Sequence, residues 1–358
     1  MALHLHTALC EQLGIHYPIV QAGMAGGPTT AALVAAVSEA GGLGTLGAAY
    51  MEPKAIRETI REIRRLTNRP FAVNLFAVSM EDDLSRIDEV QRMLHSLREQ
   101  LGISQGALHF STPDPFSEQF QILLEEQVPV ISTAFGVLND EAMRLAKQEK
   151  RTVIAMVTSV NEALMAEEQG ADILVAQGSD AGGHRGTFSL ENHAYGVNVG
   201  TFSLVPQVVD AVQVPVIAAG GIMDGRGLAA ALALGAQAVQ LGTRFLAAVE
   251  SGAHPAYKQA LLESTEESTI VTKAFSGRPA RGIRNAFIHH VEQSGIAPLP
   301  FPSQNTATGD IRKEAARQNN PEYMSLWAGQ ATRLLKADTK ASDIVQEIMQ
   351  EAASILNN

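Results

Sequence analysis

The amino-acid sequence predicts an α/β protein built as one (β/α)₈ TIM barrel, with an inserted helical segment and a C-terminal cap. Short apolar, β-rich runs recur along the chain, and each is followed by a segment with helical periodicity. There are about eight such runs, and that number of parallel strands can close on itself without leaving an unpaired edge. The 358 residues are 46% hydrophobic and only 18% charged, which suits a large aliphatic core. An open doubly wound sheet has the same local pattern and is the structural alternative.

The expected elements follow one another in a regular order. The first strand is expected at 18–21, and its helix at 30–40 begins with threonines that can cap free N–H groups. Acidic and basic residues alternate in the helix expected at 53–66, which gives it a solvated outer face. The other expected strands lie at 43–47, 70–76, 129–133, 152–157, 172–176, 215–219 and 238–241, and the other barrel helices at 140–147, 161–169, 204–212 and 227–234.

Two segments interrupt or follow this rhythm. Residues 1–76 and 128–246 are assigned to the barrel, and residues 77–127 to a helical insertion that serves as a lid or substrate side. The insertion carries expected helices near 81–101 and 118–126. Residues 247–358 lose the βα pattern and contain a proline-rich stretch and a final helix near 341–356, which predicts a C-terminal cap.

Charge and cysteine content exclude several classes of function. The net charge of −11 repels phosphate backbones and anionic lipid, so we expect no nucleic-acid or membrane partner. Cys10 is the only cysteine, which rules out an internal disulfide and a cysteine-based zinc or iron–sulfur site. The histidines at 4, 6, 289 and 290 have few carboxylates or cysteines near them in the sequence, so no metal site is expected. Without a signal peptide or an apolar membrane span, the chain is expected to be cytoplasmic.

The loops after the strands carry the candidate site residues, because a parallel barrel places its active site at the carboxyl ends of its strands. Gly23 and Met24 follow the first strand, where glycine lets backbone approach a flat ligand and methionine offers an apolar contact; the plain alternative is a glycine-rich turn. Asn74 lies in an apolar strand, and an unpaired buried amide costs about 1–3 kcal/mol. Its partner is either a loop backbone or the polar edge of a ring.

The most informative stretch is 176–188, at the end of the sixth expected strand. Gln177, Gly182, Gly183 and His184 lie close together there, and the histidine follows two glycines that can turn its ring toward the centre of the barrel mouth. We therefore predict that His184 is catalytic. We expect Arg185 either to bind an anion or to form a surface salt bridge. We expect Asp180 either to orient His184 or to cap a turn.

The last two strand ends predict a phosphate site and thereby a cofactor. Gly220 and Gly221 follow the seventh strand, and Gln240, Leu241, Gly242 and Thr243 end the eighth, so backbone N–H groups and a hydroxyl can form a phosphate cradle. With the glycine loop at 23–24 and the amides of Asn74 and Gln177, the pattern points to a mononucleotide cofactor, for which FMN is the natural candidate. The sequence contains no P-loop, dinucleotide fingerprint or GxSxG elbow in the required context.

Taken together, these motifs resemble the nitronate monooxygenase family, formerly called 2-nitropropane dioxygenases. The resemblance spans the barrel and reaches Trp327, and it is carried by the segments 21–27, 41–44, 70–76, 176–186, 218–227, 240–243 and 276–282. It implies that Gly23 and Met24 flank the isoalloxazine ring and that His184 is the active-site histidine. It also implies FMN contacts from Asn74, Gln177, Gly182, Gly183, Gly220, Gly221, Gln240, Leu241, Gly242 and Thr243.

The resemblance implies an FMN-dependent oxidation of alkyl nitronates such as propionate 3-nitronate by O₂, giving carbonyl compounds and nitrite without nicotinamide. One alternative is an NADH-dependent FMN reductase of the same superfamily, an enoyl-ACP reductase or quinone reductase. The other is a noncatalytic flavin- or phosphate-binding protein. The chain departs from the family pattern at Gly23, where a proline is common, and at the fourth strand, which lacks a second polar ring.

Overall fold

The computed structural model describes residues 4–357 and contains the predicted barrel of parallel strands. One sheet holds eight strands in the order β1-β9-β8-β6-β5-β4-β3-β2, and every neighbouring pair is parallel. The prediction of a (β/α)₈ barrel is confirmed. The strands are β1 (Ile19–Gln21), β2 (Gly44–Gly47), β3 (Phe71–Phe76), β4 (Val130–Ala134), β5 (Thr152–Val157), β6 (Ile173–Gln177), β8 (Val216–Ala219) and β9 (Ala238–Leu241).

The barrel closes between β1 and the residue that precedes β2. The N–H of Leu43 donates to the carbonyl of Ile19 and the N–H of Gln21 donates to the carbonyl of Leu43, both at 2.9 Å. The two ends of the sheet therefore meet, and the open doubly wound alternative is wrong. Helix α1 (Ala8–Leu13) covers the amino-terminal end of the barrel, where Leu9, Cys10 and Leu13 are buried with strand residues in one apolar cluster.

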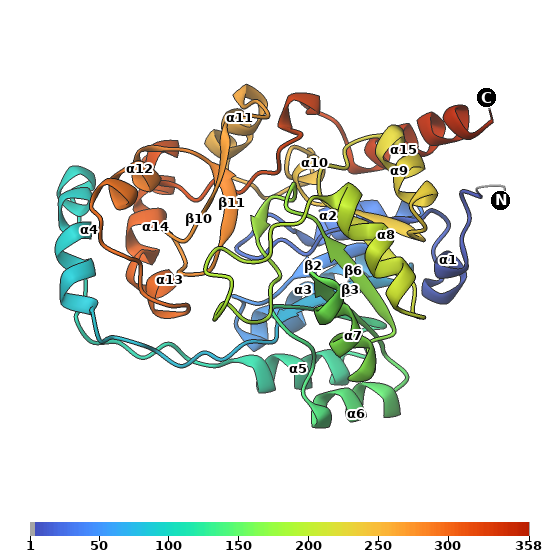
Figure 1. Ribbon diagram of the computed structural model, residues 1–358, viewed down its shortest axis with the longest axis horizontal. Coiled ribbons are helices and arrows are strands. Elements are labelled where there is room, and N and C mark those ends of the chain that lie inside the picture. Colours follow the sequence, from blue (N-terminus) through green and yellow to red (C-terminus); the bar gives the residue numbers. More distant parts are fainter. Residues whose placement is uncertain (1–3, 358) are drawn as a thin grey trace.

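Eight helices surround the strands, and local sequence explains where several begin. The side chains of Thr30, Asn139, Ser159 and Asp224 accept backbone N–H bonds at the starts of α2, α6, α7 and α9. The last helix, α15, packs between α9 and α2 and completes the ring (Figure 1). The helices are α2 (Ala31–Glu39), α3 (Pro53–Leu66), α5 (Phe116–Glu125), α6 (Asp140–Gln148), α7 (Val160–Glu168), α8 (Thr201–Ala211), α9 (Gly225–Ala233) and α15 (Ala341–Leu356).

A second body of helices stands beside the mouth of the barrel (Figure 1). Helix α4 (Ile87–Leu101) leaves the barrel and packs with later segments, because Val90 and Leu94 share an apolar cluster with Phe275 and Phe287. The later elements are α10 (Thr243–Leu246), α11 (Pro255–Glu263), β10 (Thr269–Thr272), β11 (Ala280–Ile283), α12 (Ala286–Gln293), α13 (Ser303–Ala307), α14 (Gly309–Arg317), η1 (Pro321–Tyr323) and η2 (Thr332–Leu334). The division into insertion and cap at fixed residue numbers stays a prediction.

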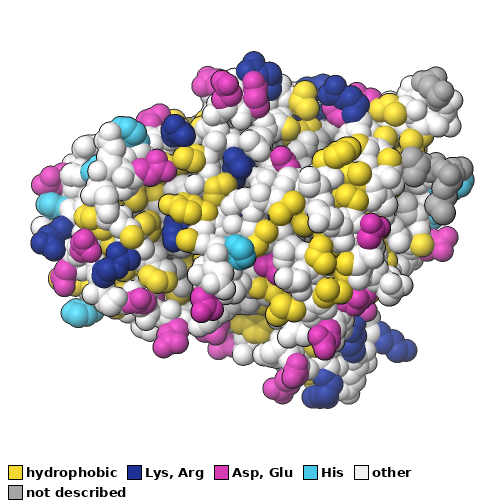
Figure 2. All heavy atoms as spheres, in the orientation of Figure 1, with side chains coloured by type: hydrophobic (Ala, Val, Ile, Leu, Met, Phe, Trp, Pro, Cys, Tyr) yellow, Lys and Arg dark blue, Asp and Glu magenta, His cyan; other side chains and the backbone are white. Residues whose placement is uncertain are grey.

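The surface carries charges of both signs. On the face in Figure 2, basic side chains lie among acidic ones, and apolar side chains are scattered between them. Within residues 4–357, no helix is both long enough and apolar enough to cross a bilayer.

Candidate functional site

A cavity of about 460 Å³ lies at the carboxyl ends of the barrel strands, where this fold places its active sites. We call it the central cavity. It is lined by all thirteen predicted site residues, which come from loops far apart in the sequence: Gly23, Met24, Asn74, Gln177, Gly182, Gly183, His184, Gly220, Gly221, Gln240, Leu241, Gly242 and Thr243. The fold thus brings the whole predicted set together, while the role of each residue stays a prediction.

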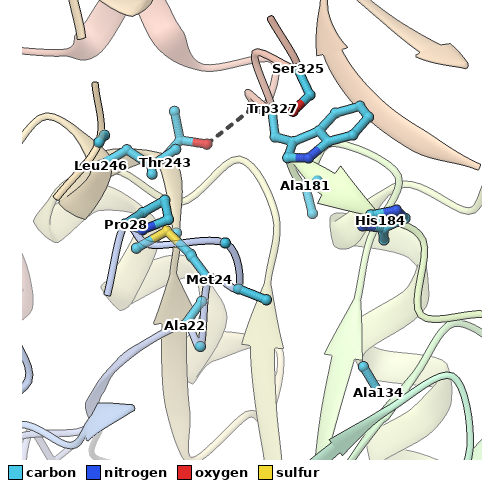
Figure 3. A pocket seen from close by; sticks show the side chains of 18 of the residues that line it. Ala22, Met24, Pro28, Ala134, Ala181, His184, Thr243, Leu246, Ser325 and Trp327 are labelled. Atoms are coloured by element: carbon cyan, nitrogen blue, oxygen red, sulfur yellow. Dashed lines mark hydrogen bonds between the residues drawn. The ribbon is translucent and has the colours of Figure 1, made fainter. Parts of the chain in front are cut away.

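His184 is held by a short strand that the sequence analysis did not identify. Gly183 and His184 form β7, which pairs antiparallel with β11, with Ala280 opposite His184. The His184 Nε2 lies 2.8 Å from Ser276 Oγ. Its ring packs against Phe135 and Trp327, with centroids 5.6 and 5.3 Å apart. In Figure 3, His184 and Trp327 lie on one side of the cavity, and Met24, Pro28 and Thr243 lie on the other.

The surroundings of His184 keep its imidazole neutral. Burial, followed by the positive charges of Arg278 and Arg312, lowers the pKa of His184 to about 3. The ring therefore carries no charge at neutral pH, and it acts as a hydrogen-bond donor or acceptor. Because Ser276 occupies Nε2, the other ring nitrogen is the one left for a ligand.

Gln177 and Arg185 fix the loop that carries the histidine. Gln177 Nε2 donates to the carbonyl of His184 at 2.9 Å, and its Oε1 accepts the N–H of Gly186 at 2.8 Å. Arg185 is fully buried and donates to the carbonyls of Gly178, Gln177 and Val197. Both expectations for Arg185 were wrong, because its guanidinium neither faces an anion site nor forms a surface salt bridge.

Asp180 caps a helix and does not contact His184. Its carboxylate accepts the N–H and the hydroxyl of Thr201, both at 2.7 Å, at the start of α8. Burial opposes ionisation, but these bonds from Thr201 outweigh it and hold the pKa of Asp180 below its ordinary value. Of the two expectations for this residue, the cap is correct.

Asn74 and Gly23 approach each other closely on the floor of the cavity. The Asn74 amide donates to Ser132 Oγ at 3.0 Å, so a neighbouring strand supplies its partner. A Cβ on Gly23 would lie 2.6 Å from the Cβ of Asn74, closer than real Cβ contacts allow. This approach requires glycine at 23, where the resembling family often has proline.

The ends of β8 and β9 provide the cradle expected for a phosphate. Gly220 and Gly221 have φ angles of 118° and 70°, which favour glycine. Within residues 4–357, the N–H groups of Gly220, Gly221 and Gly242 have no hydrogen-bond acceptor. A Cβ on Gly183 (φ 76°) would meet no atom within 4 Å, so open space lies beside this backbone. Gly183 lies on β7, beside His184, whereas the free N–H groups of Gly220, Gly221 and Gly242 line the cavity at the ends of β8 and β9, where such groups fit the phosphate of a mononucleotide.

The sequence analysis did not predict several of the residues that line the cavity. Tyr50, Ser276, Asn305 and Arg312 line the cavity, and burial raises the pKa of the Tyr50 hydroxyl to about 12. Asn305 and Arg312 lie in the cap, where no βα pattern indicates which residues turn inward. Ser276 belongs to a segment of the family resemblance, which was a usable signal.

The fold and the cavity define a (β/α)₈-barrel protein with a ligand site at the carboxyl ends of its strands. The nitronate monooxygenase family model matches residues 6–351. A probable nitronate monooxygenase from Staphylococcus haemolyticus is 43% identical over 353 residues, covering 98% of both chains. A second, from Staphylococcus aureus (strain MRSA252), is 43% identical over 347 residues, covering 96% of this chain and 97% of its own.

Two solved structures are also similar to this chain. Nitroalkane oxidase from Streptomyces ansochromogenes has a TM-score of 0.89 and 38% identity, covering 97% of this chain and 98% of its own. FabK from Thermotoga maritima has a TM-score of 0.79 and 34% identity, covering 99% and 98%. The chain belongs to the nitronate monooxygenase family and is an oxidoreductase.

Proposed function

We propose that the protein is an FMN-dependent nitronate monooxygenase that converts alkyl nitronates, such as propionate 3-nitronate, and O₂ to carbonyl compounds and nitrite. The observation that carries this proposal is the placement of His184 over a cavity that also holds free N–H groups at Gly220, Gly221 and Gly242. Family membership and the likeness to nitroalkane oxidase support it.

The proposed cofactor contacts divide between the two sides of the cavity. Gly182, Gly220, Gly221, Gly242 and Thr243 would hold the phosphate through backbone N–H groups and a hydroxyl. Gly23 and Met24 would lie against the ring system, and Asn74 and Gln177 near its polar edge. When bound, FMN supplies the transfer of electrons from the nitronate to oxygen.

His184 orients the substrate. With its proton on Nδ1, the neutral ring donates a hydrogen bond to an oxygen of the nitronate, while Nε2 accepts the Ser276 hydroxyl, which holds the ring in place. The aromatic rings of Phe135 and Trp327 exclude water from this contact, which strengthens it relative to bulk solvent.

The first experiment measures flavin and nitrite together. Protein purified without added flavin should be yellow, release FMN on denaturation, and form nitrite from propionate 3-nitronate under air. Anaerobic NADH should leave the flavin oxidised, and rapid bleaching would instead identify a reductase, an alternative kept open by the similarity to FabK. FMN binding without either reaction would identify a noncatalytic flavin protein, and colourless protein that takes up no FMN would end the proposal.

A His184→Asn variant tests the histidine. It should lower the rate of nitrite formation by about a hundredfold, the usual loss for one preorganised donor, while the FMN content per chain stays unchanged. The matched control is His289→Asn, because His289 is exposed on α12, outside the cavity. Wild-type turnover by His184→Asn would refute the assigned role.

A further inference from the structure

A partly buried guanidinium that lines the central cavity forms no ion pair with the described residues. Arg312 lies on α14 and lines the cavity together with Tyr50, Asn305 and His184. No carboxylate of residues 4–357 lies within ion-pair distance of its guanidinium. Burial lowers the pKa of Arg312, yet guanidinium groups in proteins keep their proton. The cavity therefore contains a positive charge that its surroundings do not neutralise.

The nearest candidate for a partner is already engaged. Asp310 precedes Arg312 by two residues, but its carboxylate accepts from Arg98 Nε at 2.7 Å and from Arg98 Nη2 at 3.3 Å. Arg98 is itself buried in the helical body, so this pair is fixed by packing. Asp310 thus forms its ion pair with Arg98 of α4, and although its charge still acts on Arg312, the Arg312 guanidinium has no ion-pair partner of its own in the described part of the chain.

Hydrogen bonds hold the guanidinium in one orientation. Arg312 Nη2 donates to the carbonyl of Asn305 at 2.6 Å and to Asn305 Oδ1 at 3.0 Å. Its Nε donates to the carbonyl of Thr308 at 3.4 Å. Within residues 4–357, Nη1 has no acceptor. One edge of the fork is therefore fixed by α13 and α14, and a donor on the other edge is left for a ligand.

No other described charged residue that lines the cavity neutralises Arg312. Among its described lining residues, Asp180 is the only acid, and it caps α8 beside the glycine loops. Lys313 also lines the cavity but is exposed. Tyr50 also lines the cavity, and its hydroxyl is a neutral group that can donate a hydrogen bond. This corner thus combines a fixed cation with a neutral donor.

We propose that Arg312, assisted by the Tyr50 hydroxyl, forms an oxyanion subsite that binds a planar two-oxygen anion of the substrate. The inference rests on the proposed function, because a nitronate substrate is an anion. Nitronate and carboxylate groups both present two oxygens that accept charge-assisted hydrogen bonds, and Arg312 Nη1 is the guanidinium donor left for them. Since His184 is neutral, Arg312 supplies the charge that attracts the substrate, and His184 supplies only a directed hydrogen bond.

The test uses a nonreacting anion. Propionate should bind to the flavin-loaded protein in a calorimetric titration, and the neutral isostere propionamide should bind far more weakly. Arg312→Gln should raise the dissociation constant for propionate about tenfold to a hundredfold, as expected for loss of one charge-assisted bond. Arg312→Lys keeps the charge without the fork and should fall between the two.

Arg317→Gln is the matched control. Arg317 lies on the same helix, carries the same charge and pairs with Glu314 away from the cavity, so its loss should leave propionate binding unchanged. Melting temperatures and FMN content of the variants show whether Arg312→Gln is folded. Propionate binding within twofold of wild type in folded Arg312→Gln, or an equal loss in Arg317→Gln, would overturn the subsite.

Two nitronates show which end of the substrate Arg312 holds. If Arg312 binds the nitronate group, Arg312→Gln should raise KM for both ethyl nitronate and propionate 3-nitronate. If it binds the distal carboxylate, only the KM for propionate 3-nitronate should rise. If propionate binding depends on Arg312 but no nitrite forms, the subsite is supported and the proposed function is refuted. If nitrite forms at the same KM and rate in Arg312→Gln, the proposed function is supported and the subsite is refuted.

Discussion

Phe135 shows how a single backbone angle shapes the cavity wall. It follows β4 with a φ of 71°, a left-handed conformation that costs a residue with a Cβ about 1–2 kcal/mol. Its buried ring contacts Phe76 at a centroid distance of 4.6 Å, and the Arg278 guanidinium carbon lies 4.2 Å from the ring centroid. Ring packing thus holds a strained backbone in place.

Because of this strain, we expect glycine at position 135 to give a more stable protein than alanine, which is the opposite of their usual order. Both Phe135→Ala and Phe135→Gly remove the ring, but only glycine relieves the left-handed strain. The glycine variant should therefore be about 1 kcal/mol more stable than the alanine variant, although glycine is ordinarily the less stable of the two. Denaturant unfolding of both proteins measures the difference, and a more stable alanine variant would contradict the prediction.

The low pKa of His184 predicts how stability changes with pH. Burial and the charges of Arg278 and Arg312 lower it to about 3 in the folded protein, whereas an unfolded chain titrates near the ordinary value of about 6.5. Between these values the unfolded chain binds a proton that the folded chain does not, so the free energy of unfolding falls as the pH falls. Above the ordinary pKa of histidine, neither state binds this proton, and His184 makes the free energy of unfolding no more dependent on pH.

Thermal melts of wild type and His184→Asn between pH 7 and pH 4.5 measure this effect. The variant lacks the titrating ring, so its melting temperature should decline less than that of wild type over this range. His289→Asn serves as the comparison for loss of an exposed histidine. Parallel curves for wild type and His184→Asn would show that His184 is not held neutral.

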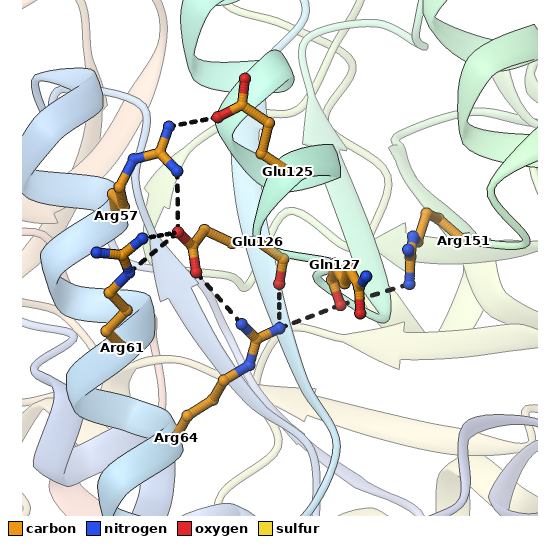
Figure 4. Close-up of polar contacts among 7 residues, drawn as sticks. All are labelled: Arg57, Arg61, Arg64, Glu125, Glu126, Gln127 and Arg151. Atoms are coloured by element: carbon orange, nitrogen blue, oxygen red, sulfur yellow. Dashed lines mark hydrogen bonds and ion pairs between the residues drawn. The ribbon is translucent and has the colours of Figure 1, made fainter.

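At the scale of elements, arginines of α3 pair with Glu125 and Glu126 at the end of α5 (Figure 4). Glu126, at the end of α5, accepts from Arg57, Arg61 and Arg64, which lie one turn apart on α3. Burial opposes ionisation of Glu126, but the bonds from Arg61 and Arg57 outweigh it and keep its pKa below the ordinary value. The network therefore stabilises the protein above that value and loses its effect as the pH falls through the lowered pKa.

Glu126→Gln should destabilise the protein by about 1 kcal/mol, at the low end for charged hydrogen bonds because the arginines keep much of their solvent. Glu125→Gln is the matched control, since its carboxylate is more exposed and pairs with Arg57 alone among the three arginines. Denaturant unfolding at pH 7 and at pH 3.5 measures both. An equal loss for both variants at pH 7, or a loss from Glu126→Gln that is as large at pH 3.5 as at pH 7, would refute the role of the network.

For the whole molecule, the C-terminal helix completes the barrel. Ile344, Val345 and Ile348 of α15 are buried in the same apolar cluster as Leu228 and Leu232 of α9. Helix α15 therefore packs against a helix that lies more than a hundred residues earlier in the sequence, and apolar burial between them stabilises the barrel.

A substitution on each face of α15 tests this contribution. Ile348→Ala should cost about 2–5 kcal/mol because the side chain is buried. Ile355→Ala, on the same helix but 43% exposed, should cost much less. Unfolding transitions of the two variants give the comparison, and similar losses would show that α15 is not a structural part of the barrel.

The sequence determined the parts of this protein that depend on local periodicity and backbone freedom. The strand–helix alternation predicted the eight strands, and the glycines at 183, 220 and 221 identified backbone turns that require positive φ. These features are readable because each depends on a few neighbouring residues. The same locality explains why the loops carrying His184 and Thr243 could be placed at one end of the barrel.

Only the tertiary structure decided what depends on contacts between distant segments. Arg185 was expected to hold either an anion or a surface salt bridge, but it is buried and donates to the backbone carbonyls of Gln177, Gly178 and Val197. Asp310, two residues before Arg312, pairs instead with Arg98, which lies 212 residues earlier in the chain, and Arg312 lines the cavity without an ion pair to any described residue. The ion-pair partner of a charged side chain depends on which distant segments of the chain pack together. A local sequence pattern does not predict that packing.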